Sequence, residues 1–136
     1  MDTDRVQQFP VTSQADVELA RRAARSLAAT LGFETADVER VALTMSELAT
    51  NLLRYAVQGE VVLAPVASAT GQGLRIESRD AGPGIADVGA ALRDGVSTAG
   101  GLGNGLPGVQ RLMDEMTITT APHGTRIVVY KWLTTQ

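Results

Sequence analysis

Glu47 and Asn51 are the first residues in this sequence whose types and spacing could do chemistry. They are four positions apart, so in a helix their side chains would point the same way. A carboxylate at 47 could accept a proton from an attacking hydroxyl or water. An amide oxygen at 51 could bind Mg²⁺, which prefers oxygen ligands. An isolated pair of this kind is usually a solvated helix face, although asparagine is a poor helix former.

Asp80 supplies a second chemical group, at the end of a stretch with strand character and just before a Gly-Pro-Gly turn at 82–84. Its carboxylate could accept a hydrogen bond from the amino group of adenine. Guanine presents a carbonyl at that place, so the same carboxylate would disfavour guanine. Taken alone, the motif could equally be a plain turn that the aspartate caps.

A glycine-rich stretch supplies the third group, because five of the thirteen residues from 97 to 109 are glycine. Apolar residues at helical spacing follow, and Pro107 suits a first turn, so we expect a helix from 107 to about 115. Backbone N–H groups at a helix start attract phosphate, and glycine permits close approach. An ordinary surface loop is the alternative for such a motif by itself. The three groups together predict a nucleotide site.

Two helices are expected ahead of these motifs. Ser13 is a suitable N-cap for the first, and Gly32 a suitable stop. Its apolar positions are 17, 20, 24, 27, 28 and 31. The second helix is expected from Thr35 to about residue 56, with a buried stripe made of Val38, Val41, Ala42, Met45, Leu48, Ala49 and Leu52. Another face of that helix aligns Thr44, Glu47, Asn51 and Arg54.

The remaining segments read mainly as strands. We expect an extended arm or strand at 3–12, a hairpin of strands 60–66 and 74–79, a short helix at 87–93, and strands 116–120 and 125–132. Helices segregated to one side of a sheet make a two-layer α/β sandwich. The predicted fold class is therefore α+β, with a mixed, mostly antiparallel sheet and helices on one face, in one domain over residues 1–136.

Composition excludes several classes of protein. The 136 residues carry a net charge of −3 without a basic block, which argues against a general nucleic-acid binder. Cysteine is absent and His123 is the only histidine, so thiolate chemistry and a histidine metal cluster are excluded. No apolar run approaches the roughly 20 residues of a membrane span, and the first residues do not resemble a secretory signal. We expect a cytoplasmic protein with no nucleic-acid or membrane partner.

Four segments resemble the nucleotide-binding boxes of the GHKL ATPases. Residues 46–51, 80–85, 101–106 and 124–125 are similar to the N, G1, G2 and G3 boxes of that superfamily. The run from 100 to 115 more specifically resembles the RsbT-like serine kinases of bacterial stress-signalling modules. Segments 46–49, 94–98 and 131–133 share that narrower resemblance.

The resemblance implies the Bergerat α/β sandwich, ATP and Mg²⁺ as cofactors, and a role for each box. Asn51 would hold Mg²⁺, Glu47 would be the catalytic base, and Asp80 would recognise adenine. A lid is implied at roughly 86–104. The full set of implied ATP-binding residues is Asn51, Asp80, Gly82, Gly84, Ile85, Gly101, Leu102, Gly103, Asn104, Gly105, Leu106 and Thr125.

Some of these residues have a more specific implied role. Gly84 would let the backbone approach the base, and Gly103 and Gly105 would contact phosphates. Thr125 would support the adenine end through water. Thr50 departs from the family pattern, which has a basic residue there, and this could alter contacts near the phosphates.

The activity that the resemblance implies is transfer of phosphate from ATP to a serine of a small STAS-domain antagonist. The freed kinase would then bind and activate a PP2C-type phosphatase, which sets a sigma factor free. Two alternatives stay open. The first is an anti-sigma factor kinase that sequesters a sigma factor, and the second is a nucleotide-gated binding module with little kinase activity.

Overall fold

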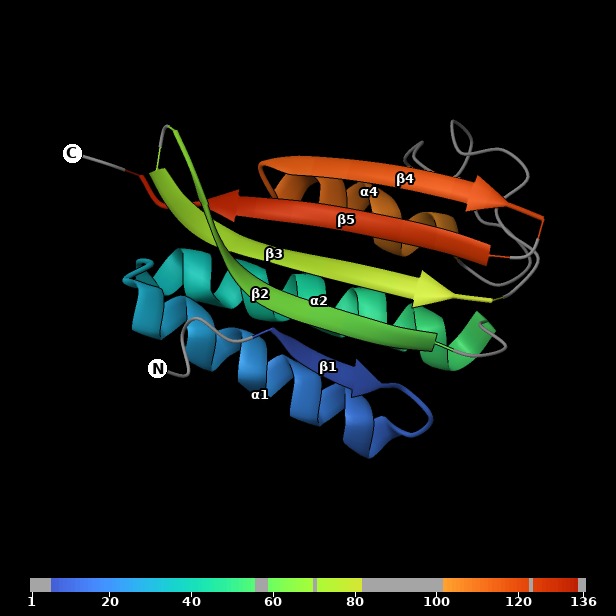
Figure 1. The fold of residues 1–136 in the computed structure, drawn as a ribbon. Helices are drawn as coiled ribbons and strands as arrows, with labels where there is room; N and C mark the ends of the chain where they lie inside the picture. The colour runs from blue at the N-terminus through green and yellow to red at the C-terminus, as the bar shows by residue number, and fades with distance from the viewer. Residues whose placement is uncertain (1–5, 56–58, 70, 82–101, 123, 135–136) are drawn as a thin grey trace.

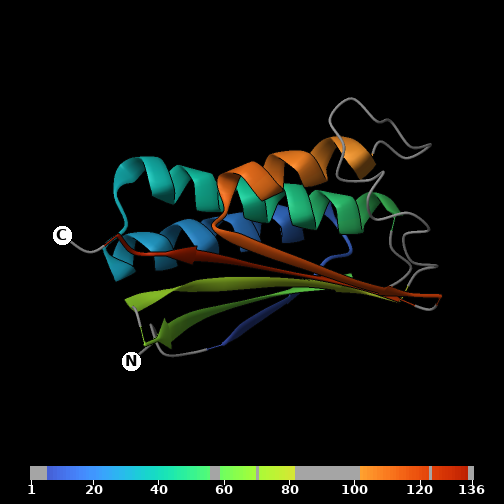
Figure 2. The same cartoon turned by 90° about the horizontal axis from the view of Figure 1, so that it is seen from above.

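All helices in the described part of the chain lie on one face of a five-stranded sheet (Figures 1 and 2). The computed structural model describes residues 6–55, 59–69, 71–81, 102–122 and 124–134. The elements in chain order are β1 (Gln7–Pro10), α1 (Gln14–Leu31), α2 (Thr35–Tyr55), β2 (Gly59–Ser68), β3 (Gly71–Asp80), α4 (Leu102–Leu112), β4 (Glu115–Ala121) and β5 (Gly124–Trp132). The predicted two-layer α+β sandwich is confirmed.

The sheet has the strand order β1-β2-β3-β5-β4. Every described pair of neighbours is antiparallel, whereas the sequence predicts a mixed, mostly antiparallel sheet. Short connections account for two of these pairs, β2–β3 and β4–β5, because a tight turn can join only antiparallel strands. The β2–β3 pairing continues to Ser68 opposite Gly71, so the connection predicted over 67–73 is mostly strand.

The boundaries of α1 follow from its sequence. The Ser13 hydroxyl accepts a hydrogen bond from the Asp16 N–H, and the Asp16 carboxylate accepts from the backbone N–H groups of Thr12 and Ser13. The hydrogen bonds that the Asp16 carboxylate accepts, above all those from the Thr12 N–H and the Thr12 hydroxyl, lower the pKa of Asp16. At the other end, Gly32 adopts a left-handed conformation with φ of 99°, which glycine adopts without strain.

The buried stripe predicted for α2 is confirmed along its whole length. Its polar face is less uniform than predicted. Thr44 is fully buried, Glu47 and Asn51 are half-buried, and Arg54 is exposed, so this row of side chains passes from the core to solvent along the helix. In the described ranges, none of the helices is long and apolar enough to cross a membrane.

The core lies between the helices and the sheet face that they cover. Alternate residues of the central strands point into it, as period-two strands require. The largest fully buried side chains include Met45, Leu48, Leu63, Leu74, Ile76 and Leu106. Each contributes about 1.5–3 kcal/mol when it leaves water, so this layer holds α2 and α4 against the strands.

The helix α4 begins at Leu102, five residues before the predicted start at Pro107. Pro107 therefore lies inside the helix, where it lacks the N–H that would bond to the carbonyl of Gly103. Burial offsets this cost, because Leu106 and Val109 are fully buried on either side of the proline. The helix predicted at 87–93 and the single histidine, His123, lie outside the described residues.

The sheet face without helices carries a charge cluster around one buried glutamate. Glu77 is only 1% exposed, and its carboxylate accepts hydrogen bonds from Arg79 and Arg126 and forms an ion pair with Arg75. The contacts of Arg126 and Arg75 with this carboxylate are both 2.7 Å long. On the same face the rings of Tyr130 and Trp132 stack with centroids 5.6 Å apart. The two aromatic residues therefore cover part of this face of the sheet.

We expect Glu77 to make stability fall in acid. Burial alone would raise its pKa, but hydrogen bonds from Arg79, Arg126 and Arg75 lower the pKa from 4.5 to about 2. Its contribution, about 3 kcal/mol, is therefore complete above the unfolded-state pKa and is lost as the pH falls towards 2. Urea unfolding of the wild type and of Glu77→Gln at a series of pH values measures this contribution.

The Glu77→Gln variant should be less stable near pH 7 and should converge with the wild type at about pH 2. Glu39→Gln is the matched control, because Glu39 also pairs with an arginine but is exposed. A constant difference between Glu77→Gln and the wild type across this pH range would contradict the prediction.

Candidate functional site

Two helices bring the first and third chemical groups together. Glu47 and Asn51 lie on α2, and Gly105 lies in the first part of α4, which packs on α2. A β-carbon placed on Gly105 would lie 3.1 Å from Asn51 Nδ2 and 3.2 Å from Glu47 Oε2. The Asn51 amide and the Glu47 carboxylate therefore lie beside Gly105, where a side chain would otherwise stand, although Gly105 is far from both residues in the sequence.

Asn51 has an unsatisfied polar atom at this meeting point. Its Nδ2 is buried and has no hydrogen-bond partner among the described residues. Leaving a buried donor unpaired costs roughly 1–3 kcal/mol. Native structures tolerate such a cost mainly where a ligand or an ordered water completes the bonding. The Asn51 amide is therefore a good candidate for contact with a bound group.

The second chemical group lies where β3 and β5 pair. Asp80 is directly opposite Thr125, so both are on the sheet face that bears the helices, together with buried Ser78 and Ile127. The Thr125 side chain is buried, and its hydroxyl lies 3.1 Å from that of Thr120. The predicted partners of the adenine end are therefore neighbours in space.

Gly124 allows this close pairing. A β-carbon there would lie 2.5 Å from the backbone carbonyl oxygen of Asp80, a distance that real side chains do not reach. Any larger residue would force β3 and β5 apart beside Asp80 and Thr125. Glycine is therefore required at position 124 for a steric reason, because the backbone of Asp80 leaves no room for a side chain there.

The structure shows only part of the glycine-rich motif. Leu102, Gly103 and Asn104 begin the first turn of α4, and the N–H groups of such a first turn have no partner within the helix. Such a turn favours an anion. The side chain of Leu106, in contrast, is fully buried and anchors the helix in the core. Gly82, Gly84, Ile85, Gly101 and most of the implied lid are not among the residues described.

Sequence reasoning missed Thr120 as a neighbour of the site. Its hydroxyl is paired with that of Thr125 across the β4–β5 turn. The available signal was its position opposite Thr125, because threonines that face each other across antiparallel strands often share a hydrogen bond.

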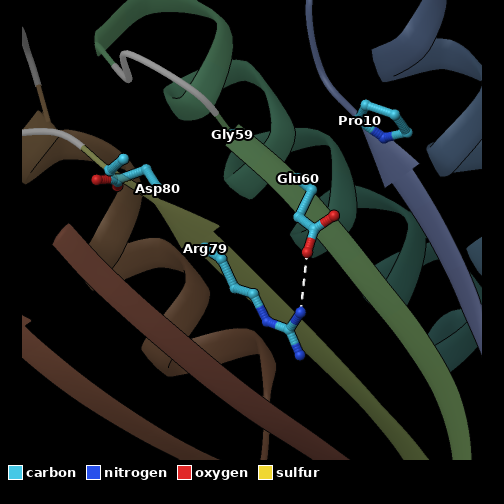
Figure 3. Close-up of a pocket in the computed structure, with 6 residues that line it drawn as sticks. Pro10, Gly59, Glu60, Arg79 and Asp80 are labelled. Carbon is cyan, nitrogen blue, oxygen red and sulfur yellow. Dashed lines mark hydrogen bonds and ion pairs between the residues drawn. The ribbon is translucent and has the colours of Figure 1, made fainter.

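A hollow of about 280 Å³ adjoins Asp80 at the ends of three strands. Figure 3 shows Glu60 and Arg79 in front of the strands that carry them, with the helices behind. Their ion pair is 2.8 Å long. The hollow is lined by Pro10, Gly59, Glu60, Arg79, Asp80 and Ala81. It does not include Glu47, Asn51 or Gly105, so it is distinct from their meeting point.

Two comparisons of sequence identify relatives of this chain. Residues 10–131 match the family described as histidine kinase-like ATPase domain. The chain is also 44% identical over 124 residues to the serine/threonine-protein kinase RsbT of Bacillus subtilis (strain 168). That alignment covers 90% of this chain and 93% of the relative.

Solved structures share the fold at lower identity. The RsbU and RsbW domains of Rv1364c from Mycobacterium tuberculosis match with a TM-score of 0.63 and 19% identity, covering 96% of this chain and 33% of that one. The histidine kinase domain of Erythrobacter litoralis EL346 blue-light activated histidine kinase matches with a TM-score of 0.54 and 22% identity, covering 86% of this chain and 63% of that one. These similarities support the fold alone.

The family match spans most of the chain, and the kinase relative is aligned over nearly its full length. The arrangement of helices on one face of the sheet agrees with that assignment. The chain therefore belongs to the RsbT-like serine/threonine-protein kinases of the GHKL superfamily, whose domain is the histidine kinase-like ATPase domain.

Proposed function

We propose that this kinase transfers the γ-phosphoryl group of ATP to a serine of a STAS-domain antagonist, and then binds and activates a PP2C-type phosphatase. The convergence of Glu47, Asn51 and Gly105 between α2 and α4 carries the proposal. It supports phosphoryl transfer because a proton acceptor, an oxygen ligand and the first turn of a helix meet there. The 44% identity to a serine/threonine-protein kinase supports a serine or threonine hydroxyl as the acceptor.

Asn51 fits the role of magnesium ligand. Its amide oxygen is a hard, neutral ligand atom, and the buried Nδ2 of the same group, which has no partner among the residues described, supports contact of the amide with a bound group. Mg²⁺ usually takes one or two protein ligands and fills its remaining positions with phosphate oxygens and water. When bound, it neutralises the negative charge that develops on the transferring phosphate.

Glu47 acts as the general base in this proposal. It is one helical turn before Asn51, half-buried, and its carboxylate faces the same part of α4. It accepts the proton of the serine hydroxyl as the hydroxyl oxygen forms its bond to the γ-phosphorus. The bond from that phosphorus to the bridging oxygen breaks, and ADP leaves with the electron pair.

Asp80 and Thr125 recognise the adenine end. The Asp80 carboxylate accepts a hydrogen bond from the exocyclic amino group of adenine. Thr125, whose hydroxyl is paired with that of Thr120, contacts the adenine end through a water molecule. A site built on a specific hydrogen bond discriminates strongly against a base that cannot make it. Gly103 and the N-terminal turn of α4 bind the phosphates.

Asn51→Ala should abolish phosphoryl transfer and leave the protein folded. The substitution removes an amide whose Nδ2 has no partner among the described residues, so no hydrogen bond from that nitrogen to them is lost. We expect at least a hundredfold lower transfer, about the scale at which a misplaced catalytic group reduces the rate. Transfer of ³²P from ATP to the STAS-domain protein encoded nearest to this gene measures it.

Thermal unfolding should show that Asn51→Ala is folded, and wild-type-like transfer by this variant would falsify the role assigned to Asn51.

Experiments with the wild type test the proposed partners. Nucleotide binding by the wild type without transfer to the STAS protein would favour the nucleotide-gated binding module. Co-purification with a sigma factor in place of a PP2C-type phosphatase would favour the anti-sigma factor kinase.

Asp80→Asn should weaken the preference for ATP over GTP. The amide offers both a donor and an acceptor, so it loses the selective acceptor of the carboxylate. We expect the ratio of the two nucleotide affinities to fall by about tenfold or more. Titration calorimetry with each nucleotide measures the ratio, and Glu60→Gln is the control because Glu60 lies on the opposite face of the sheet. An unchanged ratio in Asp80→Asn would overturn the adenine role.

A further inference from the structure

The backbone conformation at position 105 does not require a glycine. Among the described glycines only Gly32 and Gly71 have positive φ, so Gly105 has a conformation open to any residue. It lies within α4, where glycine is among the least favourable residues. The reason for a glycine at position 105 must therefore lie in the side chains that surround it.

The space in which a side chain would lie is filled by two polar groups. The β-carbon position is 3.1 Å from Asn51 Nδ2, 3.7 Å from Asn51 Oδ1 and 3.2 Å from Glu47 Oε2. The first and last of these distances are tighter than ordinary van der Waals contact. The helix cannot easily move away to make room, because Leu106 and Val109 hold it in the core.

We infer that Gly105 is a positioning residue, whose missing side chain lets Glu47 and Asn51 lie side by side against α4. This inference rests on the proposed function and adds a role to the phosphate contact that the family resemblance implies for this glycine. A methyl group at 105 displaces the carboxylate and the amide by a few tenths of an ångström. The displacement moves the proton acceptor and the oxygen ligand away from the phosphate that they share.

Gly108 provides a matched control on the same helix. It lies three residues further along α4, and a β-carbon there would meet nothing within 4 Å. Gly108→Ala therefore gains helix propensity without crowding any neighbour. Gly105→Ala gains the same propensity and adds the contact with Asn51 and Glu47, so the comparison isolates that contact.

The experiment compares both variants with the wild type in the full chain. Gly105→Ala should lower kcat for transfer to the STAS-domain protein by about tenfold, with a smaller change in KM for ATP. Calorimetry with ATP in EDTA should give the wild-type affinity, whereas the gain in affinity on adding Mg²⁺ should shrink. Gly108→Ala should keep wild-type kcat and melt about 3–5 °C higher.

Two readouts do not depend on phosphoryl transfer. The NMR signal of the Asn51 side-chain amide, assigned by its loss in Asn51→Ala, should shift in nucleotide-free Gly105→Ala and stay in place in Gly108→Ala. In the wild type, the change in melting temperature caused by Gly105→Ala includes the cost of crowding Asn51. In an Asn51→Ala background that cost is absent, so the same substitution should change the melting temperature more favourably. This double variant keeps the test valid if Gly105→Ala alone folds poorly.

Several results would overturn the positioning role. Equal losses of ATP affinity with and without Mg²⁺ would assign Gly105 to phosphate contact alone. An unshifted Asn51 amide signal with a lower melting temperature would mean that α4 moves as a whole. Failure of the wild type to phosphorylate the STAS protein would count against the proposed function, while the amide signal and the double variant still decide the role of Gly105.

Discussion

The packing of α4 on α2 is the contact on which the candidate site depends. It is close at Gly105 because no side chain stands between that backbone and the polar groups of Glu47 and Asn51. Buried apolar residues before and after the contact, including Leu48 and Leu106, hold the two helices together. Hydrophobic burial thus keeps the Asn51 amide in place, although its buried Nδ2 has no hydrogen-bond partner in the described part of the chain and such a group is costly.

A second close approach, between β3 and β5, organises the other end of the site. Gly124 lets the strands meet beside Asp80, and their register places Asp80 opposite Thr125. The same strand pair is tied on its other face by Glu77, which accepts from Arg126 of β5. The sheet is therefore fixed on both faces near the residues proposed to bind adenine, so their spacing does not depend on the glycine-rich segment.

Local signals in the sequence were sufficient wherever a residue acts through its own backbone or its near neighbours. The cap at Ser13, the helix stop at Gly32 and a strand over 74–79 were predicted correctly for this reason. The start of α4 was predicted wrongly, because proline was judged by its own preference. Core burial of Leu106 on the preceding position outweighs that preference, and burial depends on elements distant in the sequence.

The sequence by itself determined the order of the nucleotide-binding motifs, the residue types they contain and the kinase family they resemble. The order of these motifs and the residues in them can be read along the chain without any knowledge of distances in space. Only the tertiary structure decided that Gly105 faces Glu47 and Asn51, that Thr120 supports Thr125, and that three arginines enclose Glu77. Such contacts join residues far apart along the chain, and their distances follow from how whole helices and strands pack, which no local pattern encodes.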